Sequence, residues 1–400
     1  MVSERNLSKN VCIIGAGPSG LVAAREVRKE EHNVVVLEQN NDVGGQWLYQ
    51  PKVEHEDPLG KASVQNVHSS IYASLRLTSP REIMGYTDFP FVMKKGRDSR
   101  RFPGHRELLL YLQDFCKYFG LREMIRFNTR VEYWSIEKDA EKGMEEIFDA
   151  IVVATGHYSQ PRLPNIKGLF LHYLIPKGFW NPVVVAVGNS LSGQDIGMEL
   201  VDVAKEIHLS AKSLDVSEGL SKVISKYHNL HLRTPTYSFP FLDTKGMVAV
   251  DDGRVGPLYE HTFPPSLAPS LSFIGILKKF IGFPFFESQA KWIAQLLSGK
   301  RTLPSWDEMM QSIKEFYRSI EVDGIPKHNT HDIANFEYCD KYADYIGFPH
   351  LEELRKELCL SAIRNADINL DTYRDSYDDS EMLQAAYQSP HFTHLGPEAF

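Results

Sequence analysis

The sequence predicts an α/β fold with two dinucleotide-binding, Rossmann-like domains, the second inserted in the first, plus a mostly helical C-terminal tail. Two short apolar runs, 11–14 and 183–187, each lead into a loop that begins and ends with glycine. Runs of this length and composition are typical of buried parallel strands. A third such run at 150–154 precedes the second unit, and a strand-like segment at 271–275 follows it. The first unit is therefore interrupted by the second and resumes after it.

The first unit has the order strand, helix, strand. Residues 21–29 show helical spacing of apolar side chains, and 33–38 form a second apolar strand, so the unit fits within about 30 residues. In such a loop the first glycine allows a tight turn, the second lets the backbone approach a pyrophosphate, and the third lets the helix pack on the strand. The helix N-terminus offers free N–H groups to the phosphates. The expected cofactor-binding residues here are Gly15, Gly17, Pro18, Ser19 and Gly20.

An acidic residue, Glu38, ends the second strand. A carboxylate at this place accepts hydrogen bonds from a ribose and repels a 2′-phosphate, which favours FAD or NAD. Gly44 and Gly45 follow, and two adjacent glycines have two interpretations. They form a plain turn, or they let the chain pass close to the rest of a long dinucleotide. FAD favours the second interpretation, which adds Gly45, Gln46 and Trp47 to the expected site.

The second loop departs from the glycine pattern because Ser190 stands at the middle position. Serine is small and its hydroxyl is a donor, so a phosphate can still approach. The next strand ends in Ser210-Ala211-Lys212, where a hydroxyl and an ammonium suit a 2′-phosphate and favour NADPH. A strand-turn-helix without ligand, and a solvated Lys212, are the alternatives. The expected NADPH-binding residues are Gly188, Asn189, Ser190, Ser192, Gly193, Ser210 and Lys212.

These assignments divide the chain into an FAD-binding domain in two parts, an NADPH-binding domain inserted between them, and a tail. The expected boundaries are 1–160 and 246–303 for the FAD-binding domain, 161–245 for a shortened NADPH-binding domain, and 304–400 for the helical C-terminal region.

Two nucleotide sites imply that NADPH gives hydride to a flavin. The four cysteines form no CxxC motif, which excludes a zinc ribbon, a thioredoxin-type pair and the paired-cysteine centre of a disulfide reductase. His328 and His331 are close in sequence, but two histidines without clustered partners are more often hydrogen-bonded surface groups than metal ligands, so no metal is expected. Dioxygen is the remaining electron acceptor.

Composition limits the partners and the location. A net charge of −8 argues against a nucleic-acid surface. The polar first ten residues lack a secretory signal, and no run reaches the roughly 18 apolar residues of a membrane span. We therefore expect a cytoplasmic protein without a membrane anchor or nucleic-acid partner.

Seven segments together resemble the flavin-containing monooxygenases, in particular the plant branch of glucosinolate S-oxygenases. They occur in the family's order through most of the chain, and they are Gly15-Ala16-Gly17-Pro18-Ser19-Gly20, Val43-Gly44-Gly45-Gln46-Trp47, Pro80-Arg81-Glu82-Ile83-Met84-Gly85-Tyr86, Arg101-Phe102-Pro103-Gly104-His105, Ala154-Thr155-Gly156-His157-Tyr158, Gly188-Asn189-Ser190-Leu191-Ser192-Gly193 and Phe283-Pro284-Phe285-Phe286-Glu287-Ser288-Gln289.

The resemblance implies a chemistry. NADPH reduces FAD, O2 adds at the flavin C4a, and the hydroperoxide oxygenates a soft nucleophile, thioether sulfur first and amine nitrogen as the alternative. The reactive group then belongs to the cofactor, so little acid–base machinery is needed. The resemblance also assigns Thr155, Gly156 and Gln289 to FAD, and it places Thr78 where much of the family has an asparagine near the flavin.

The chain departs from the family around the second loop. The family's FxGxxxHxxx(Y/F) fingerprint is reduced to Ile166-Lys167-Gly168 and His172, with Pro176 at its end. The segment 217–242 is too short for the family's further strands, since one βαβ unit takes about 30 residues. Two alternatives to the monooxygenase follow, namely a catalytically impaired FAD-binding isoform and an uncoupled NADPH oxidase that makes hydrogen peroxide.

Overall fold

The structure is a computed structural model, and it describes most of the chain outside the second nucleotide-binding unit. The described residues are 8–51, 71–135, 146–156, 183–187, 198, 206–210, 230–231, 244–251, 254–277, 282–332 and 335–393. Within them the strands are β1 Asn10–Ile14, β2 Asn33–Leu37, β3 Ile125–Arg126, β4 Ala150–Val153, β5 Val183–Val187, β6 Glu206–Ser210, β7 Leu230–His231, β8 Ala249–Asp251, β9 Arg254–Gly256 and β10 Leu271–Phe273.

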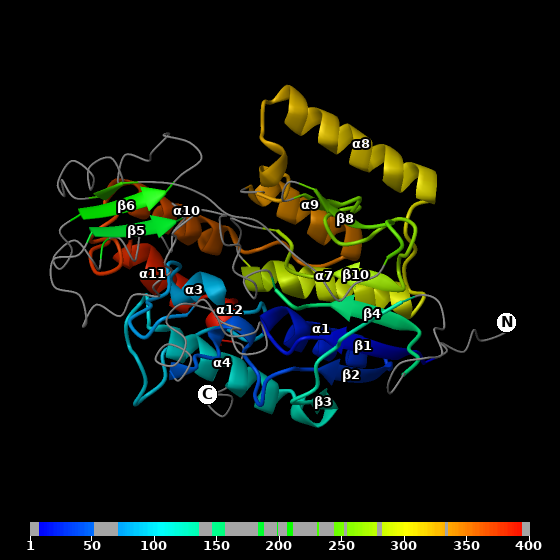
Figure 1. The fold of residues 1–400 in the computed structure, drawn as a ribbon. Helices are drawn as coiled ribbons and strands as arrows, with labels where there is room; N and C mark the ends of the chain where they lie inside the picture. The colour runs from blue at the N-terminus through cyan, green and yellow to red at the C-terminus, as the bar shows by residue number, and fades with distance from the viewer. Residues whose placement is uncertain are drawn as a thin grey trace.

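The helices alternate with these strands in the first part of the chain and dominate its last part (Figure 1). The α-helices are α1 Pro18–Lys29, α3 Arg81–Met84, α4 His105–Tyr118, α7 Gly282–Leu297, α8 Trp306–Val322, α9 Phe336–Ile346, α10 Glu353–Ile368, α11 Ser380–Tyr387 and α12 Pro390–Thr393, and the short 3₁₀ turns are η1 Gly45–Trp47, η2 Arg122–Met124 and η4 Lys327–Asn329.

The main sheet is parallel and has the order β10-β4-β1-β2-β3. β1 lies between β2 and β4, in registers that pair Ile13 with Val36 and with Val152. All four residues of β4 are buried, as expected for a strand covered on both faces. β10 pairs with β4, although more than 100 residues separate them in the chain. The sheet thus takes strands from both sides of the second unit.

The second sheet is also parallel, with the order β5-β6-β7. β5 and β6 pair over their full lengths, from Val183 opposite Glu206 to Val187 opposite Ser210. β5 coincides with the apolar run 183–187 that the sequence predicts as a strand, and β6 is the next strand, ending at Ser210. The α/β class with two Rossmann-like units and a helical tail is confirmed, whereas the residue boundaries of the domains stay a prediction.

Helix α1 covers the main sheet and packs against α7 (Figure 1). Leu21, Ala24 and Val27, the predicted apolar face of α1, are buried. α7 begins at Gly282, and Pro284 is tolerated in its first turn because the N–H groups there have no intrahelical partner. The core of the molecule is formed where these two helices meet the sheet.

The C-terminal tail is helical, as the sequence predicts, and two of its helices are long. α8 spans 17 residues and α10 spans 16. α8 starts with a capping box, in which Ser305 and Glu308 satisfy each other's free backbone N–H groups. α9 is followed by Gly347, whose φ of +62° suits a left-handed C-cap. In the described part of the chain, no helix has both the length and the apolar character required to cross a bilayer.

Candidate functional site

The expected FAD-binding residues gather at one edge of the main sheet. β1, β2, β4 and β10 are parallel, so their carboxyl ends meet there. The glycine loop 15–20 follows β1, Glu38 follows β2, Thr155 and Gly156 follow β4, and Gly275 follows β10. In open α/β sheets this edge is where ligands bind.

The glycine loop is packed too tightly for side chains. A Cβ on Gly20 would lie 1.8 Å from the carbonyl oxygen of Gly15, so the start of α1 reaches the strand only because residue 20 is glycine. A Cβ on Gly15 would lie 2.6 Å from the carbonyl oxygen of Ala154, and Gly15 has a φ of +105°. Both contacts have the geometry that the sequence predicts for these glycines.

The turn at Gly44 and Gly45 lies directly against this loop. The Gly44 N–H donates to the Ala16 carbonyl at 3.0 Å. A Cβ on Gly45 would come within 2.9 Å of the Gly17 Cα. Gln46 and Trp47 continue from this turn in η1 and are half-buried. The structure thus brings residues 45–47 beside the glycine loop.

Glu38 is buried and is hydrogen-bonded to the glycine loop 15–20. Its Oε2 accepts the Ala16 N–H at 2.7 Å, and its Oε1 accepts both the backbone N–H and the side-chain amide of Asn40 at 2.8 Å. A carboxylate has about four lone-pair positions, so these three hydrogen bonds do not use all of them. The same side chain shapes the loop and presents a negative charge at the strand end.

The side-chain amide of Gln289 joins Gly275 to Thr262. It is fully buried, its Oε1 accepts the Gly275 N–H at 3.2 Å, and its Nε2 donates to Thr262 Oγ1 at 2.8 Å. Gly275 in turn lies beside Ser19, because a Cβ on Gly275 would be 3.0 Å from Ser19 Oγ. The structure therefore places Gln289 behind the site, where it orients Gly275 against the first turn of α1.

Thr78 lies in a bend on a different segment. It is half-exposed, and its hydroxyl makes no hydrogen bond within the described residues. The backbone before it is fixed by the Leu77 N–H, which donates to the Pro103 carbonyl at 2.8 Å, and the backbone after it by the Arg81 N–H, which donates to the Arg101 carbonyl at 3.0 Å.

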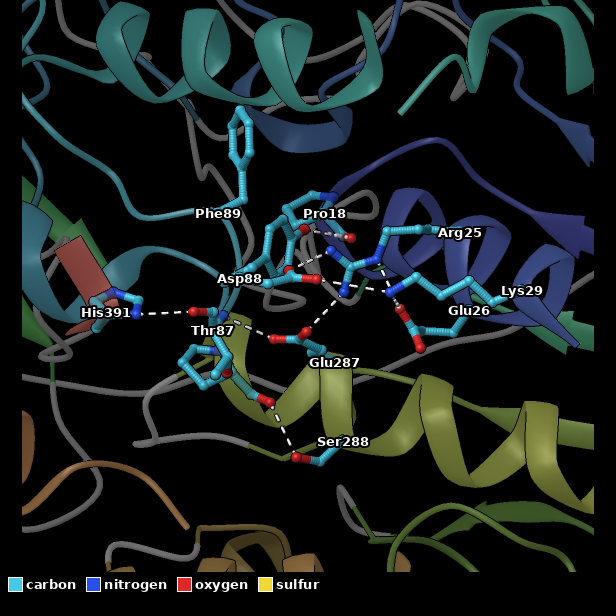
Figure 2. Close-up of polar contacts among 12 residues, drawn as sticks. Pro18, Arg25, Glu26, Lys29, Thr87, Asp88, Phe89, Glu287, Ser288 and His391 are labelled. Atoms are coloured by element: carbon cyan, nitrogen blue, oxygen red, sulfur yellow. Dashed lines mark hydrogen bonds and ion pairs between the residues drawn. The ribbon is translucent and has the colours of Figure 1, made fainter. Parts of the chain in front are cut away.

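A buried ion cluster behind the glycine loop was not predicted from the sequence (Figure 2). Arg25 of α1 is 1% exposed and donates to Glu26 at 2.7 Å, to Asp88 at 2.5 Å and to Glu287 of α7 at 2.7 Å. Burial alone lowers the pKa of Arg25, but the carboxylates, Glu287 foremost, outweigh it, so the pKa lies above its usual value. Arg25 therefore stays cationic and joins α1 to α7.

The same cluster reaches the first residue of α1. Glu287 Oε2 accepts the Thr87 N–H at 2.8 Å, and the adjacent Tyr86 hydroxyl donates to the Pro18 carbonyl at 2.7 Å (Figure 2). His391 Nδ1 donates to the Thr87 carbonyl at 2.9 Å, which ties α12 to this segment. Arg25 and Glu26 stand between the apolar residues Ala24 and Val27 of α1, and this pair of charges is the sequence feature that could have indicated these contacts.

The expected NADPH-binding residues fall mostly outside the description of the structure. Gly188, Asn189, Ser190, Ser192, Gly193 and Lys212 lie outside the described residues. Ser210 is the last residue of β6 and pairs with Val187, so it stands at the carboxyl end of its strand.

The predicted surface position of His331 is wrong. His331 is 1% exposed, and its Nε2 accepts the Val255 N–H at 3.0 Å. Its proton is therefore on Nδ1, which donates to Nδ1 of the buried His261 at 2.9 Å. The backbone fold of 254–263 buries His331 as a hydrogen-bonding partner, and the described residues hold no cluster of three or more metal-ligand side chains.

This pair makes stability depend on pH. Burial lowers the pKa of His261 to about 3, so the folded protein resists the proton that the unfolded chain takes up near pH 6.5. The contribution is complete above pH 6.5 and is lost progressively as the pH falls toward 3. Between pH 6.5 and pH 5 we expect a loss of about 2 kcal/mol in the free energy of unfolding.

Denaturant unfolding at several pH values measures this loss. His261→Gln, which keeps an acceptor for His331, should reduce the slope of stability against pH over that window. An identical slope in the variant and the wild type would contradict the assignment.

Comparison with known proteins shows the family of the chain. The profile of the flavin-binding monooxygenase-like family matches residues 8–228 and 230–356. The chain is 62% identical to Flavin-containing monooxygenase FMO GS-OX-like 9 of Arabidopsis thaliana, over 98% of each chain, and 60% identical to GS-OX-like 8 of the same plant, over 98% of this chain and 97% of the relative.

The chain is shorter internally than these relatives. Its alignment with GS-OX-like 9 extends over 451 residues, whereas the chain has 400, so at least 51 positions (451 minus 400) have no residue here. The family match is interrupted at residue 229, between β6 and β7. This break lies within 217–242, the segment that the sequence indicates is shortened.

Solved structures show the same fold. S-allyl-L-cysteine S-oxygenase from Allium sativum matches with a TM-score of 0.86 and 37% identity, over 97% of this chain and 99% of that one. Tmm from Pelagibacter sp. matches in fold, with a TM-score of 0.71 and 21% identity, over 92% and 93% of the two chains. The chain therefore belongs to the flavin-binding monooxygenase-like family, among its plant GS-OX-like members, and is an FAD- and NADPH-dependent monooxygenase, as the sequence predicts.

Proposed function

We propose that this chain transfers one oxygen atom of O2 to the sulfur of a small thioether. The balanced reaction converts thioether, O2, NADPH and a proton into sulfoxide, water and NADP⁺. The likeness to the garlic S-oxygenase carries the thioether assignment, because it extends over nearly the whole of both chains. Amine nitrogen, the other soft nucleophile that this chemistry accepts, is the alternative acceptor.

The edge of the main sheet fits FAD. The N-cap of α1 is Gly17, and no side chain caps the helix there. The N–H groups of the first turn are therefore free to bind a pyrophosphate at this place. Gly17 and Gly45 leave room there that side chains would fill. When bound, FAD supplies the redox and oxygen-transfer chemistry. The residues proposed to hold it are Gly15, Gly17, Pro18, Ser19, Gly20, Glu38, Gly45, Gln46, Trp47, Thr155 and Gly156, with Gln289 acting through Gly275.

NADPH is proposed to lie at the carboxyl end of β5 and β6. The loop 188–193 follows β5, and Ser210 ends β6 with Lys212 two residues beyond. A hydroxyl and an ammonium there suit the 2′-phosphate that distinguishes NADPH from NADH. The residues proposed for this role are Gly188, Asn189, Ser190, Ser192, Gly193, Ser210 and Lys212.

Thr78 is proposed to donate a hydrogen bond in the oxygenation site. We expect Thr78→Val to raise the share of consumed NADPH that ends as hydrogen peroxide about fivefold, since one neutral hydrogen bond contributes about 1 kcal/mol. Thr78→Ser keeps the hydroxyl and should stay near the wild type. The peroxide formed per NADPH consumed, measured with a thioether present, checks this. Equal ratios in the valine variant and the wild type would remove Thr78 from the site.

One experiment tests the function as a whole. The protein is purified with its flavin, mixed with NADPH without oxygen, and then given O2 with S-allyl-L-cysteine or a trialkylamine. Bleaching of the flavin followed by sulfoxide supports the proposal, and N-oxide without sulfoxide supports the amine alternative. If NADPH does not bleach the flavin, both the thioether proposal and the amine alternative are wrong.

A second candidate, an NADPH oxidase that releases hydrogen peroxide, is favoured by one observation. At least 51 positions of the GS-OX-like relative are missing here, and the break in the family match falls beside β7. Stoichiometric hydrogen peroxide without any oxygenated product would select this function.

A further inference from the structure

The C-terminal tail is hydrogen-bonded to the segment that carries Thr78. Arg374 Nε donates to the Leu77 carbonyl at 3.1 Å. That carbonyl belongs to the same planar peptide unit as the Thr78 N–H, so the hydrogen bond fixes the orientation of the unit that leads into Thr78. Nearly 300 residues separate the two partners in the chain.

Asp375, the residue after Arg374, binds Arg76, the residue before Leu77. Asp375 accepts a bidentate pair of hydrogen bonds from Arg76, at 2.8 Å each, and Arg76 Nε also donates to the Phe102 carbonyl at 3.1 Å. Two consecutive tail residues therefore hold two consecutive residues before Thr78. Bidentate arginine–carboxylate pairs fix geometry as well as charge.

The tail is itself anchored where it makes these contacts. Tyr373, next to Arg374, is buried and packs edge-on against Phe102, with ring centroids 5.4 Å apart. Asp379 pairs with both terminal nitrogens of the buried Arg101. Arg374 thus extends from a fixed support on both sides, which distinguishes its hydrogen bond from a loose surface contact.

We propose that Arg374 is a positioning residue for the oxygenation reaction and acts by orienting the Leu77–Thr78 peptide. The proposal rests on the proposed function, in which Thr78 faces the flavin. Arg81 and Pro103 hold the bend by backbone hydrogen bonds, and Arg374 is the side chain that restrains the carbonyl entering it. Misplacement of a catalytic group by about 1 Å costs up to about 100-fold in rate, so a small release here reaches the chemistry.

Arg374→Met tests the proposal because methionine keeps an apolar stem and removes the donor. The Leu77 amide reports on the bend because its N–H is protected by the hydrogen bond to the Pro103 carbonyl. We expect its hydrogen exchange to become about fivefold faster, in the protein with or without flavin, since one hydrogen bond of about 1 kcal/mol that holds the bend is lost. We also expect the peroxide formed per NADPH to rise several-fold, while flavin content and the anaerobic reduction of flavin by NADPH stay within twofold of the wild type. Arg374→Lys, which keeps a donor, should recover part of both effects.

Arg301→Met is the matched control. Arg301 donates to the Tyr345 carbonyl at 2.6 Å, so it too is an arginine that holds a backbone carbonyl, but its partner is in α9. It should change neither exchange at Leu77 nor the peroxide ratio.

The outcomes are separable. Unchanged exchange at Leu77 in Arg374→Met overturns the proposal, and so does a proportional fall of flavin content, flavin reduction and product, which would indicate general damage. If the wild type makes no oxygenated product at all, the proposed function fails. The exchange measurement then still decides whether Arg374 positions the bend.

Discussion

Arg25→Met is expected to lower the free energy of unfolding by about 3–5 kcal/mol and to reduce the flavin content of the purified protein. Removal of one partner from a buried ion cluster leaves the others uncompensated, and this costs far more than the loss of an exposed pair. Here Glu287 would remain buried with no guanidinium beside it, at a side-chain exposure of 3%, and Glu26, 7% exposed, would keep only its ion pair with Lys29 (Figure 2). Flavin is lost as well because the cluster fixes α1, whose N-terminus faces the site.

Urea unfolding of the apoprotein and flavin absorbance of the purified holoprotein measure the two effects. Arg122→Met is the matched control, because Arg122 also pairs with an aspartate, Asp42, but its side chain is 61% exposed. Exposed pairs contribute about 0–1 kcal/mol, so this control should unfold near the wild type. In a double-mutant cycle, Arg25→Met and Glu287→Gln should show a coupling of at least about 1 kcal/mol. If Arg25→Met costs no more than Arg122→Met, the cluster does not stabilise the fold.

The sequence predicted the parts of the site that are local in the chain. The first glycine loop, Glu38 and the turn at Gly44 lie within some 30 residues of each other, and glycine spacing and apolar runs are enough to place them. The packing roles of Gly15 and Gly20 were predictable for the same reason. A positive φ at Gly15 and a 1.8 Å approach at Gly20 leave no room for any other residue.

Contacts that depend on distant segments could not be predicted in this way. Gln289 was assigned to FAD by resemblance alone, and the sequence does not show that its amide bonds Gly275 and Thr262, which lie on a different segment from α7. The Arg25–Glu287 pair joins residues 262 positions apart. A single sequence shows that a charge is present on a helix, but not which distant element will bury it.

The tail shows the same limit. Capping residues such as Ser305 and Asn335 mark helix starts, but the lengths of α8 and α10 depend on tertiary packing, which extends helices beyond their local propensity. The hydrogen bond from Arg374 to Leu77 follows from the path of this tail across 74–104. The sequence assigned the tail no role at the site.

Gly17→Ala is expected to leave the apoprotein folded and to weaken FAD binding by about 100-fold, which corresponds to about 3 kcal/mol. The backbone of Gly17 has a φ of −75°, which alanine adopts readily, and the added Cβ would lie 3.5 Å from the Gly45 Cα, an ordinary contact. The protein itself therefore tolerates the methyl group. A pyrophosphate that approaches the backbone at this position does not.

Two other glycine variants serve as comparisons for Gly17→Ala, one expected to damage folding and one expected to be neutral. Gly20→Ala puts a Cβ 1.8 Å from the Gly15 carbonyl oxygen and should damage folding and flavin binding together. Gly104→Ala is the matched control, since Gly104 is the N-cap of α4 with a similar φ of −66°, and an added Cβ there meets no atom closer than 3.6 Å. It should fold and bind flavin as the wild type does.

Flavin fluorescence titrations and thermal unfolding of the three apoproteins separate binding from folding. Wild-type affinity in Gly17→Ala would show that the pyrophosphate does not approach α1 at its N-cap. Loss of folding in Gly17→Ala would show that this glycine is required by the chain itself. Only normal folding with weak binding assigns the space beside Gly17 to the cofactor, because among the described residues an added Cβ meets only Gly45, at an ordinary contact distance.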